Sequence, residues 1–144
     1  MLGRFTFRPL VPADLAMVEE WLARPHVAEW WQGPIELDDD VQAFIAILDD
    51  QPAGYIQVYT TNDPSRRGID QFLCHAGDLG RGLGTAMVRA FVERIFADPA
   101  VTSVQLDPHV RNARAIRCYQ KAGFVAEGEV ATGDGPALLM TLRR

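Results

Sequence analysis

The stretch DLGRGLGTAM, residues 78–87, has glycines at the three alternate positions 80, 82 and 84, directly before an apolar-periodic segment. The first N–H groups of a helix have no partner within the helix, and the helix dipole adds partial positive charge there. Glycines at that entrance let an anion approach these N–H groups closely. The stretch therefore predicts either a phosphate cradle at the start of a helix or a tight strand-to-helix turn without a ligand.

The spacing excludes two known phosphate motifs. A Walker loop requires lysine after its last glycine, but Leu83 follows Gly82. The dinucleotide fingerprint requires a third glycine at the position that Thr85 occupies. What remains is a phosphate cradle of another kind, with Arg81 beside it as a charged partner.

The rest of the chain alternates short apolar strands with amphipathic helices and has no linker or internal repeat. The expected strands are 4–8, 42–48, 54–59, 66–74, 103–107, 124–130 and 137–142. The expected helices are 12–24, 84–96 and 112–123, the last with Asn112 as N-cap and Gly123 as C-terminal stop. Turn-forming residues at 49–52 predict a hairpin. This order predicts a mixed sheet in one α/β or α+β domain spanning residues 1–144.

Composition narrows the classes of partner. The net charge is -5, and Lys and Arg form no long block, which argues against a nucleic-acid partner and is compatible with a cationic one. The N-terminal residues MLGRFTFRPL contain no apolar stretch of signal length, and no run approaches a membrane span, so we expect a cytoplasmic protein without a membrane partner. Two distant cysteines, without a CxxC pair or clustered histidines, predict reduced thiols and no metal site.

Two separated motifs together resemble the acetyl-CoA signature of the GNAT N-acetyltransferase superfamily. They are GRGLGT at 80–85 and RNARAIRCYQKAGF at 111–124. The family pattern is Arg/Gln-x-x-Gly-x-Gly/Ala with a later Asn-x-x-Ala-x-x-x-Tyr-x-x-x-Gly-Phe. The Arg/Gln position falls on Leu79 here, so Arg81 or backbone N–H groups would have to contact the phosphate.

The GNAT resemblance implies a mixed, mostly antiparallel sheet of six to seven strands with flanking helices, and acetyl-CoA as co-substrate. It implies that the pantetheine arm pairs with the fourth strand like an added strand, that the pyrophosphate lies over the cradle, and that Asn112 contacts the cofactor arm. The implied cofactor-binding residues are Phe72, Leu73, Cys74, Gly80, Arg81, Gly82, Leu83, Gly84, Thr85 and Asn112.

Five stretches resemble one group within this superfamily, the aminoglycoside 6'-N-acetyltransferases. They are HVAEWW at 26–31, GIDQ at 68–71, LGRGLGT at 79–85, AIRCYQKAGF at 115–124 and GDGPA at 133–137. This resemblance implies direct transfer of acetyl to a primary amine of a polycationic sugar antibiotic. It implies that Asp70 accepts the amine proton, directly or through water. It also implies that Asp107 contacts the antibiotic and that Tyr119 protonates the leaving thiolate.

General chemistry favours the same residue types. An alkylammonium must lose a proton before it can attack, and a carboxylate can both hold the cation and take that proton. A thiolate with a pKa of about 8.5 leaves more easily if a hydroxyl protonates it. Without the resemblance, Asp70 is a solvated acid at a strand end and Tyr119 is a core tyrosine.

Other residues carry competing interpretations. Trp30 and Trp31 form an aromatic wall for the acceptor, or one of them packs on the first helix. Cys74 is either a nucleophile or, in the favoured interpretation, a small core residue. His75 and His109 are either bases or solvated loop residues.

Two segments are shorter than in the aminoglycoside enzymes. The stretch from WWQGPIELDDD to QAFIAIL omits most of a helix, and YTTNDPSRRG lacks a Trp- and Glu-rich insertion. Both differences predict a more open and less acidic acceptor pocket. An aminoglycoside remains the expected acceptor. The alternatives are a polyamine, a siderophore hydroxylamine, a peptide N-terminus, or a non-catalytic acyl-CoA-binding domain. Both a monomer and a homodimer are compatible with the sequence.

Overall fold

The computed structural model describes residues 4–144, in which one seven-stranded sheet forms the centre of the fold. The first three residues of the predicted domain 1–144 and of the N-terminal stretch MLGRFTFRPL lie outside the described residues. The strands are β1 (Phe5–Pro9), β2 (Val41–Leu48), β3 (Gln51–Thr60), β4 (Arg66–Leu73), β5 (Ser103–Leu106), β6 (Val125–Thr132) and β7 (Gly135–Arg143). Their order is β1-β2-β3-β4-β5-β7-β6, and among the strands of residues 4–144 β4 and β5 form the one parallel pair. The predicted mixed, mostly antiparallel sheet is confirmed.

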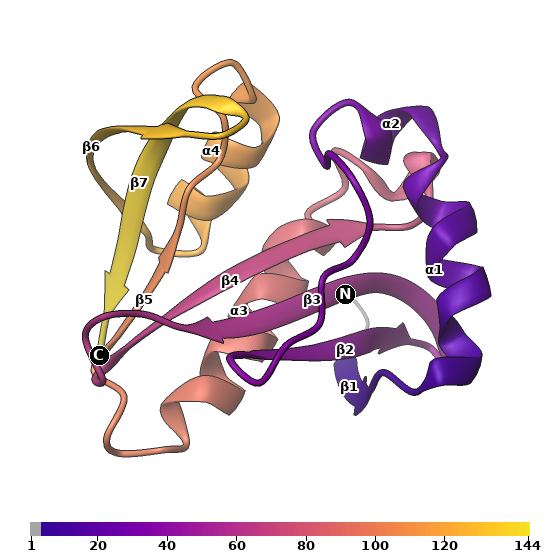
Figure 1. Cartoon of the computed structure of the whole chain (residues 1–144), viewed down its shortest axis with the longest axis horizontal. Helices are drawn as coiled ribbons and strands as arrows, with labels where there is room; N and C mark the ends of the chain where they lie inside the picture. Colours follow the sequence, from indigo (N-terminus) through magenta and orange to yellow (C-terminus); the bar gives the residue numbers. More distant parts are fainter. Residues whose placement is uncertain (1–3) are drawn as a thin grey trace.

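In the described part of the chain, four α-helices flank the sheet (Figure 1). They are α1 (Leu15–Leu22), α2 (Pro25–Ala28), α3 (Leu83–Phe96) and α4 (Ala113–Lys121), with 3₁₀ turns at Pro12–Asp14 and Ala76–Asp78. The predicted helix 12–24 is therefore shorter than expected. The short helix α2, which starts at a proline, was not predicted because four residues carry too little periodicity to register. No helix in the described part of the chain is long and apolar enough to cross a membrane.

Side-chain alternation along the strands divides the core between the two faces of the sheet. Ile56 and Ile69 point to the face covered by α3, where they pack in one cluster with Phe91. Tyr55, one residue earlier on β3, packs on the opposite face with Trp21 of α1. The sheet is thus a wall with α3 and α4 on one side and α1 on the other.

The hairpin between β2 and β3 turns more tightly than predicted. Asp49 and Asp50 alone form the turn, with φ angles of 51° and 64°, and Gln51 already belongs to β3. Two-residue hairpin turns favour positive φ because that twist matches the flanking strands. The predicted turn at 49–52 was therefore too long. Pro52 lies in the strand next to a register shift between Ala46 and Ile47, the kind of irregularity that tolerates proline.

β4 and β5 pair over only three residues and then separate. The pairs run from Arg66 with Ser103 to Gly68 with Gln105. The ring of Tyr59 lies directly over Gly68, where a Cβ would lie 2.0 Å from a ring atom. Beyond Gly68, β4 continues to Leu73 while pairing with β3 alone in the described part of the chain. Figure 1 shows the two strands diverging from their shared end, which leaves one edge of β4 open.

Candidate active site

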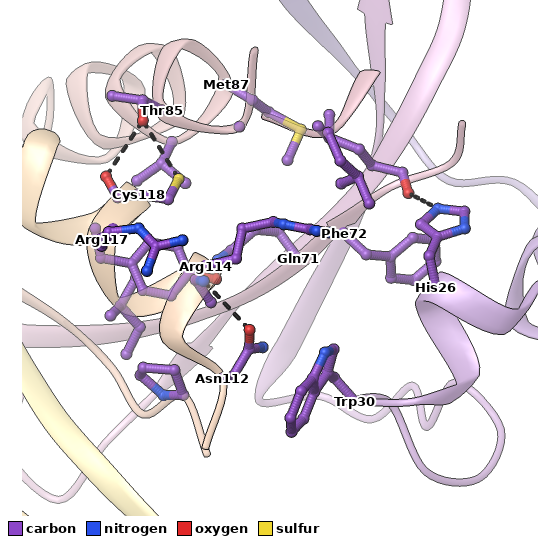
Figure 2. Close-up of a pocket in the computed structure, with 18 of the residues that line it drawn as sticks. His26, Trp30, Gln71, Phe72, Thr85, Met87, Asn112, Arg114, Arg117 and Cys118 are labelled. Carbon is purple, nitrogen blue, oxygen red and sulfur yellow. Dashed lines mark hydrogen bonds between the residues drawn. The ribbon is translucent and has the colours of Figure 1, made fainter. Parts of the chain in front are cut away.

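A cleft of about 700 Å³ opens where β4 separates from β5. The segment around α2 lines one side, and the start of α3 and the exposed side of α4 line the other. Figure 2 shows His26 and Trp30 reaching in from the α2 segment and Arg114 and Arg117 from α4. Gln71 and Phe72 of β4 form part of the floor between them.

The glycine-rich stretch forms the predicted strand-to-helix entrance. Gly80 and Gly82 have φ angles of 75° and 80°, in the left-handed region that side-chain-bearing residues rarely adopt. Gly82 is the N-cap of α3, and no side chain in the described residues caps this helix start. The first N–H groups of α3 therefore remain available to a ligand, as a phosphate cradle requires.

Most of the predicted cofactor-binding residues line the cleft. They are Phe72, Leu73, Gly80, Gly82, Gly84, Thr85 and Asn112. Asn112 also caps α4 as predicted, because its side chain accepts a hydrogen bond from the N–H of Ala115. The hydroxyl of Thr85 donates to the carbonyl of Cys118 at 3.3 Å and so ties α3 to α4.

Three predicted cofactor residues lie elsewhere. The side chain of Arg81 is exposed and is not part of the cleft lining. Leu83 is buried in a core cluster with Phe5 and Met87. Cys74 is fully buried beside Trp21, and burial raises the pKa of its thiol to about 11. A thiol with that pKa stays protonated at neutral pH, which favours the core role of Cys74 over the nucleophile.

The cleft also has a basic wall that the sequence reasoning missed. Arg114, Arg117 and Lys121 of α4 line it on the same side as the cradle. Their spacing of three and four residues brings them to one side of a helix. This spacing of basic residues after Asn112 is visible in the sequence and could have predicted the basic wall.

Asp70 lies on the face of β4 that α1 covers. Its Oδ2 accepts a hydrogen bond of 3.0 Å from the side-chain amide of Gln57 on β3. Burial raises the pKa of Asp70 to about 6, the negative charge of Asp107 adds to this, and the hydrogen bond from Gln57 opposes it. A carboxyl group with this pKa is mostly anionic at neutral pH and can accept a proton.

Tyr119 reaches the same stretch of β4 from the other face. The side-chain amide of Gln71 donates a hydrogen bond of 2.5 Å to its hydroxyl oxygen. Because this oxygen acts as the acceptor, the hydroxyl proton is available to another partner. Burial raises the pKa of Tyr119 above its ordinary value, so the group is protonated at neutral pH. The oxygen of the same amide, Oε1 of Gln71, is buried without a hydrogen-bond partner in the described structure.

Carboxylates gather at the α2 end of the cleft. Glu29 and Asp107 line it together with Asp70. Burial raises the pKa of Asp107, and the charge of Asp134 raises it further. The negative charge of Asp107 also raises the pKa of Asp70, and a cation between these two carboxylates would relieve that repulsion.

The two tryptophans have different environments. The Trp31 ring packs at 5.6 Å from Tyr55 and 5.4 Å from Phe72, within the cluster under α1. Trp30 is 41% exposed, and its ring meets His109 at 5.8 Å. Both tryptophans line the cleft, so Trp31 belongs to the wall and to the core at once.

The three histidines contact backbone groups or a neighbouring side chain. A ring nitrogen of His26 lies 2.8 Å from the carbonyl oxygen of Leu73, at the end of β4. His109 lines the cleft, and its Nδ1 accepts the N–H of Arg111. His75 is exposed beside the guanidinium of Arg24 and lies outside the cleft lining. No group of three or more His, Cys, Asp or Glu side chains within residues 4–144 is arranged to hold a metal ion.

Residues 11–132 match the family model described as an acetyltransferase (GNAT) domain. The chain belongs to the GNAT acetyltransferase family. This acetyltransferase is 43% identical to aminoglycoside N(6')-acetyltransferase type 1 of Klebsiella pneumoniae over 166 aligned positions, which cover 96% of this chain and 83% of the relative. It is 58% identical over 82 residues to a kanamycin resistance protein of Rhizobium radiobacter, covering 57% of this chain and 76% of that protein. The predicted resemblance is confirmed.

Solved structures agree with the sequence relatives. The acetyltransferase superposes with a TM-score of 0.90 on aminoglycoside acetyltransferase AAC(6')-Ib in complex with coenzyme A and kanamycin, at 45% identity and covering 97% of this chain and 95% of that one. The complex of the same enzyme with ribostamycin and coenzyme A gives 0.92 at 43% identity, covering 98% and 94%. The alignment of 166 positions is longer than the 144 residues of this chain, so the Klebsiella relative contains segments that this acetyltransferase lacks.

Proposed function

We propose that this GNAT acetyltransferase transfers the acetyl group of acetyl-CoA directly to the 6'-amino group of an aminoglycoside. The observation that carries the proposal is the 43% identity with an aminoglycoside N(6')-acetyltransferase over nearly the whole chain. The structures it resembles hold coenzyme A together with kanamycin or ribostamycin. Antibiotic resistance is part of the proposal, because one relative is named a kanamycin resistance protein.

The charge distribution of the cleft fits two unlike substrates. Arg114, Arg117 and Lys121 line the cleft near the glycine cradle and suit the phosphates of acetyl-CoA. Asp70 and Asp107 suit a polycationic sugar, whose positive charge would offset the repulsion by which Asp107 raises the pKa of Asp70. The cleft therefore favours an anionic cofactor on the α4 side and a cationic acceptor on the α2 side.

The open edge of β4 fits the pantetheine arm. Between Ile69 and Leu73, β4 pairs on one side with β3 alone, so its other side offers backbone N–H and C=O groups to an added strand. Gly80 and Gly82 leave room for the pyrophosphate at the start of α3. When bound, acetyl-CoA supplies an acetyl group activated as a thioester.

Asp70 and Tyr119 divide the two proton transfers. Asp70 accepts the proton that the amine loses as the new C–N bond forms. Tyr119 donates its hydroxyl proton to the sulfur as the C–S bond breaks. Asp107 and the rings of Trp30 and Trp31 hold the sugar amine next to Asp70.

The test is the release of coenzyme A thiol from acetyl-CoA, with kanamycin, tobramycin, lysine and spermidine as acceptors. We expect turnover with the two aminoglycosides, and mass spectrometry should locate the acetyl group on the 6' nitrogen. Expression in a sensitive bacterial host should raise the inhibitory concentration of kanamycin. Turnover with lysine or spermidine alone would overturn the antibiotic assignment, and binding of acetyl-CoA without any turnover would support a non-catalytic domain.

A second acceptor class has one observation in its favour. The chain is 26% identical to the lysine N-acyltransferase MbtK of a Mycobacterium species, over 87% of this chain and 61% of that protein. Lysine is therefore the non-aminoglycoside amine that the assay should include first.

We further propose that residues 1–144 act as one catalytic domain in the cytoplasm, as a monomer or homodimer without nucleic acid or membrane partners. The net charge of -5 disfavours phosphate-backbone partners, and free thiols at Cys74 and Cys118 suit a reducing compartment. Size-exclusion chromatography with light scattering and cell fractionation test these points.

A further inference from the structure

Gln57 faces Asp70 directly across the β3–β4 ladder. The two residues are register partners, so their side chains leave the sheet on the same face. The amide nitrogen of Gln57 lies 3.0 Å from Oδ2 of Asp70. In the described part of the chain this is the hydrogen bond that reaches the Asp70 carboxylate.

The contact with Tyr55 determines whether the amide nitrogen or the amide oxygen of Gln57 faces Asp70. The Tyr55 hydroxyl donates to Oε1 of Gln57 at 2.6 Å. An amide that accepts at its oxygen presents its NH₂ to the other neighbour, so the contact with Tyr55 directs a donor at the carboxylate. Burial raises the pKa of Tyr55 well above its ordinary value, so the hydroxyl keeps the proton that it donates.

The hydroxyl of Tyr55 is itself held in place. Tyr55 is fully buried, and its ring stacks on Phe72 at 5.5 Å. Trp31 packs edge-on against the same ring at 5.6 Å. A chain of contacts thus runs from the aromatic wall of the cleft through Tyr55 and Gln57 to Asp70.

We propose that Gln57 is a positioning residue for Asp70, with its amide orientation fixed by Tyr55. This inference rests on the proposed function, because it gives Asp70 the role of base. Gln57 holds Oδ2 and stabilises the anionic carboxylate, which leaves Oδ1 for the amine of the acceptor. Tyr55 and Gln57 therefore set the direction and the basicity of the carboxylate without touching the substrate.

The other titratable groups that interact with Asp70 all disfavour its charge or leave it unchanged. They come from three elements: Tyr55 and Tyr59 on β3, Asp107 after β5, and Tyr119 on α4. The negative charge of Asp107 raises the pKa of Asp70, whereas the hydrogen bond from Gln57 lowers it. Removing that hydrogen bond must therefore raise the pKa of Asp70.

The experiment follows the carboxyl carbon of Asp70 by ¹³C NMR during a pH titration of the substrate-free protein, with the signal assigned by its loss in Asp70→Asn. We expect Gln57→Leu to raise the pKa of Asp70 by about one unit. Gln57→Glu, which replaces the donor with a second carboxylate, should raise it further. Tyr55→Phe, which removes only the orienting hydroxyl, should raise it by less. Gln51→Leu, the same change at an exposed position of β3, is the matched control and should leave it unchanged.

The acid limb of the pH profile of kcat/KM should move with the NMR titration in each variant. A titration of Asp70 in Gln57→Leu that superimposes on wild type overturns the proposal. If Gln57→Leu fails to fold, Tyr55→Phe decides the matter, because an unchanged titration there contradicts the orienting role. The NMR titration needs no acceptor, so its result stands apart from any failure of the aminoglycoside assay.

Discussion

Asp70 and Gln71 are neighbours on β4 whose side chains bind partners on opposite faces of the sheet. Asp70 accepts a hydrogen bond from Gln57 of β3, and Gln71 donates one to Tyr119 of α4. Consecutive strand residues point to opposite faces. The carboxylate proposed as proton acceptor and the hydroxyl proposed as proton donor therefore approach the open edge of β4 from opposite sides, the arrangement that a transfer between two bound substrates requires.

Replacing Asp70 by asparagine should remove the proton acceptor and keep the fold. We expect kcat/KM for kanamycin to fall by about 10²-fold or more, with an unchanged Kd for acetyl-CoA by calorimetry. In the wild-type enzyme, protonation of Asp70 should make kcat/KM fall as the pH drops through about 6. This limb should be absent from the residual activity of Asp70→Asn. Wild-type rates in the variant would contradict the role of base.

Replacing Tyr119 by phenylalanine should slow the departure of the thiolate. The change removes one oxygen and leaves the ring in contact with Phe124, so the fold should persist. We expect kcat to fall by about 10²-fold with little change in the Kd for acetyl-CoA. If a cofactor with a better leaving group, such as an acetyl thioester of lower thiol pKa, fails to recover the rate, the role of proton donor is wrong.

Arg117 and Arg81 make different predictions for cofactor affinity. Arg117 lines the cleft, whereas Arg81 is exposed and lies outside its lining. Arg117→Gln should weaken acetyl-CoA binding by about tenfold, the value of one charge-assisted contact, and Arg81→Gln should weaken it by less. Calorimetry at two salt concentrations measures both. If Arg81→Gln weakens acetyl-CoA binding more than Arg117→Gln does, the sequence-based prediction that Arg81 contacts the phosphate is supported instead.

Substitutions of the two tryptophans should have different effects, on kanamycin binding for Trp30 and on folding stability for Trp31. Trp31→Ala removes ring contacts with Tyr55 and Phe72 and should cost about 3 kcal/mol of unfolding free energy in urea. Trp30→Ala should cost less than about 1 kcal/mol, because the ring is 41% exposed. It should still raise the KM for kanamycin about fivefold if the ring contacts the sugar. An unchanged KM would exclude Trp30 from the acceptor site.

Gly54 tests how closely β3 must approach β4. A Cβ at Gly54 would lie 2.4 Å from the backbone oxygen of Phe72, so Gly54→Ala must push the two strands apart. We expect a loss of about 1–3 kcal/mol in unfolding free energy. Gly77→Ala is the matched control, because its Cβ would meet nothing within 4 Å, and its effect should stay within about 0.5 kcal/mol.

The sequence was sufficient to predict those parts of the molecule that depend on local patterns. The strands alternate clearly, and the glycines at 80 and 82 adopt the positive φ angles that make them useful at a helix entrance. Asn112 caps its helix because the capping residue and its partner are only three positions apart. Such features need no knowledge of distant contacts.

The rest depends on contacts between segments far apart in the chain. Nothing near Arg81 indicates that its side chain turns to solvent while Arg117 lines the cleft. The partner of Asp70 is Gln57, thirteen residues earlier on another strand, and only the register between the strands brings them together. The contact between Trp30 and His109 joins segments that strand and helix patterns cannot relate.

Because β4 pairs with β5 over only three residues, a small tilt of β4 at Gly68 produces a larger displacement at its far end, in the cleft. From Gly68 to Leu73, β4 extends about 17 Å beyond the last paired residue, at about 3.3 Å per residue. A tilt of about 5° of β4 at Gly68, together with its ladder partner β3, would move the far end by about 1.5 Å. A displacement of about 1 Å can cost 10²-fold in rate. Tyr59, whose ring lies over Gly68, therefore sits where the least movement has the greatest effect. The tolerance of the chemistry therefore depends on the closed end of the cleft, two residues before Asp70 on β4.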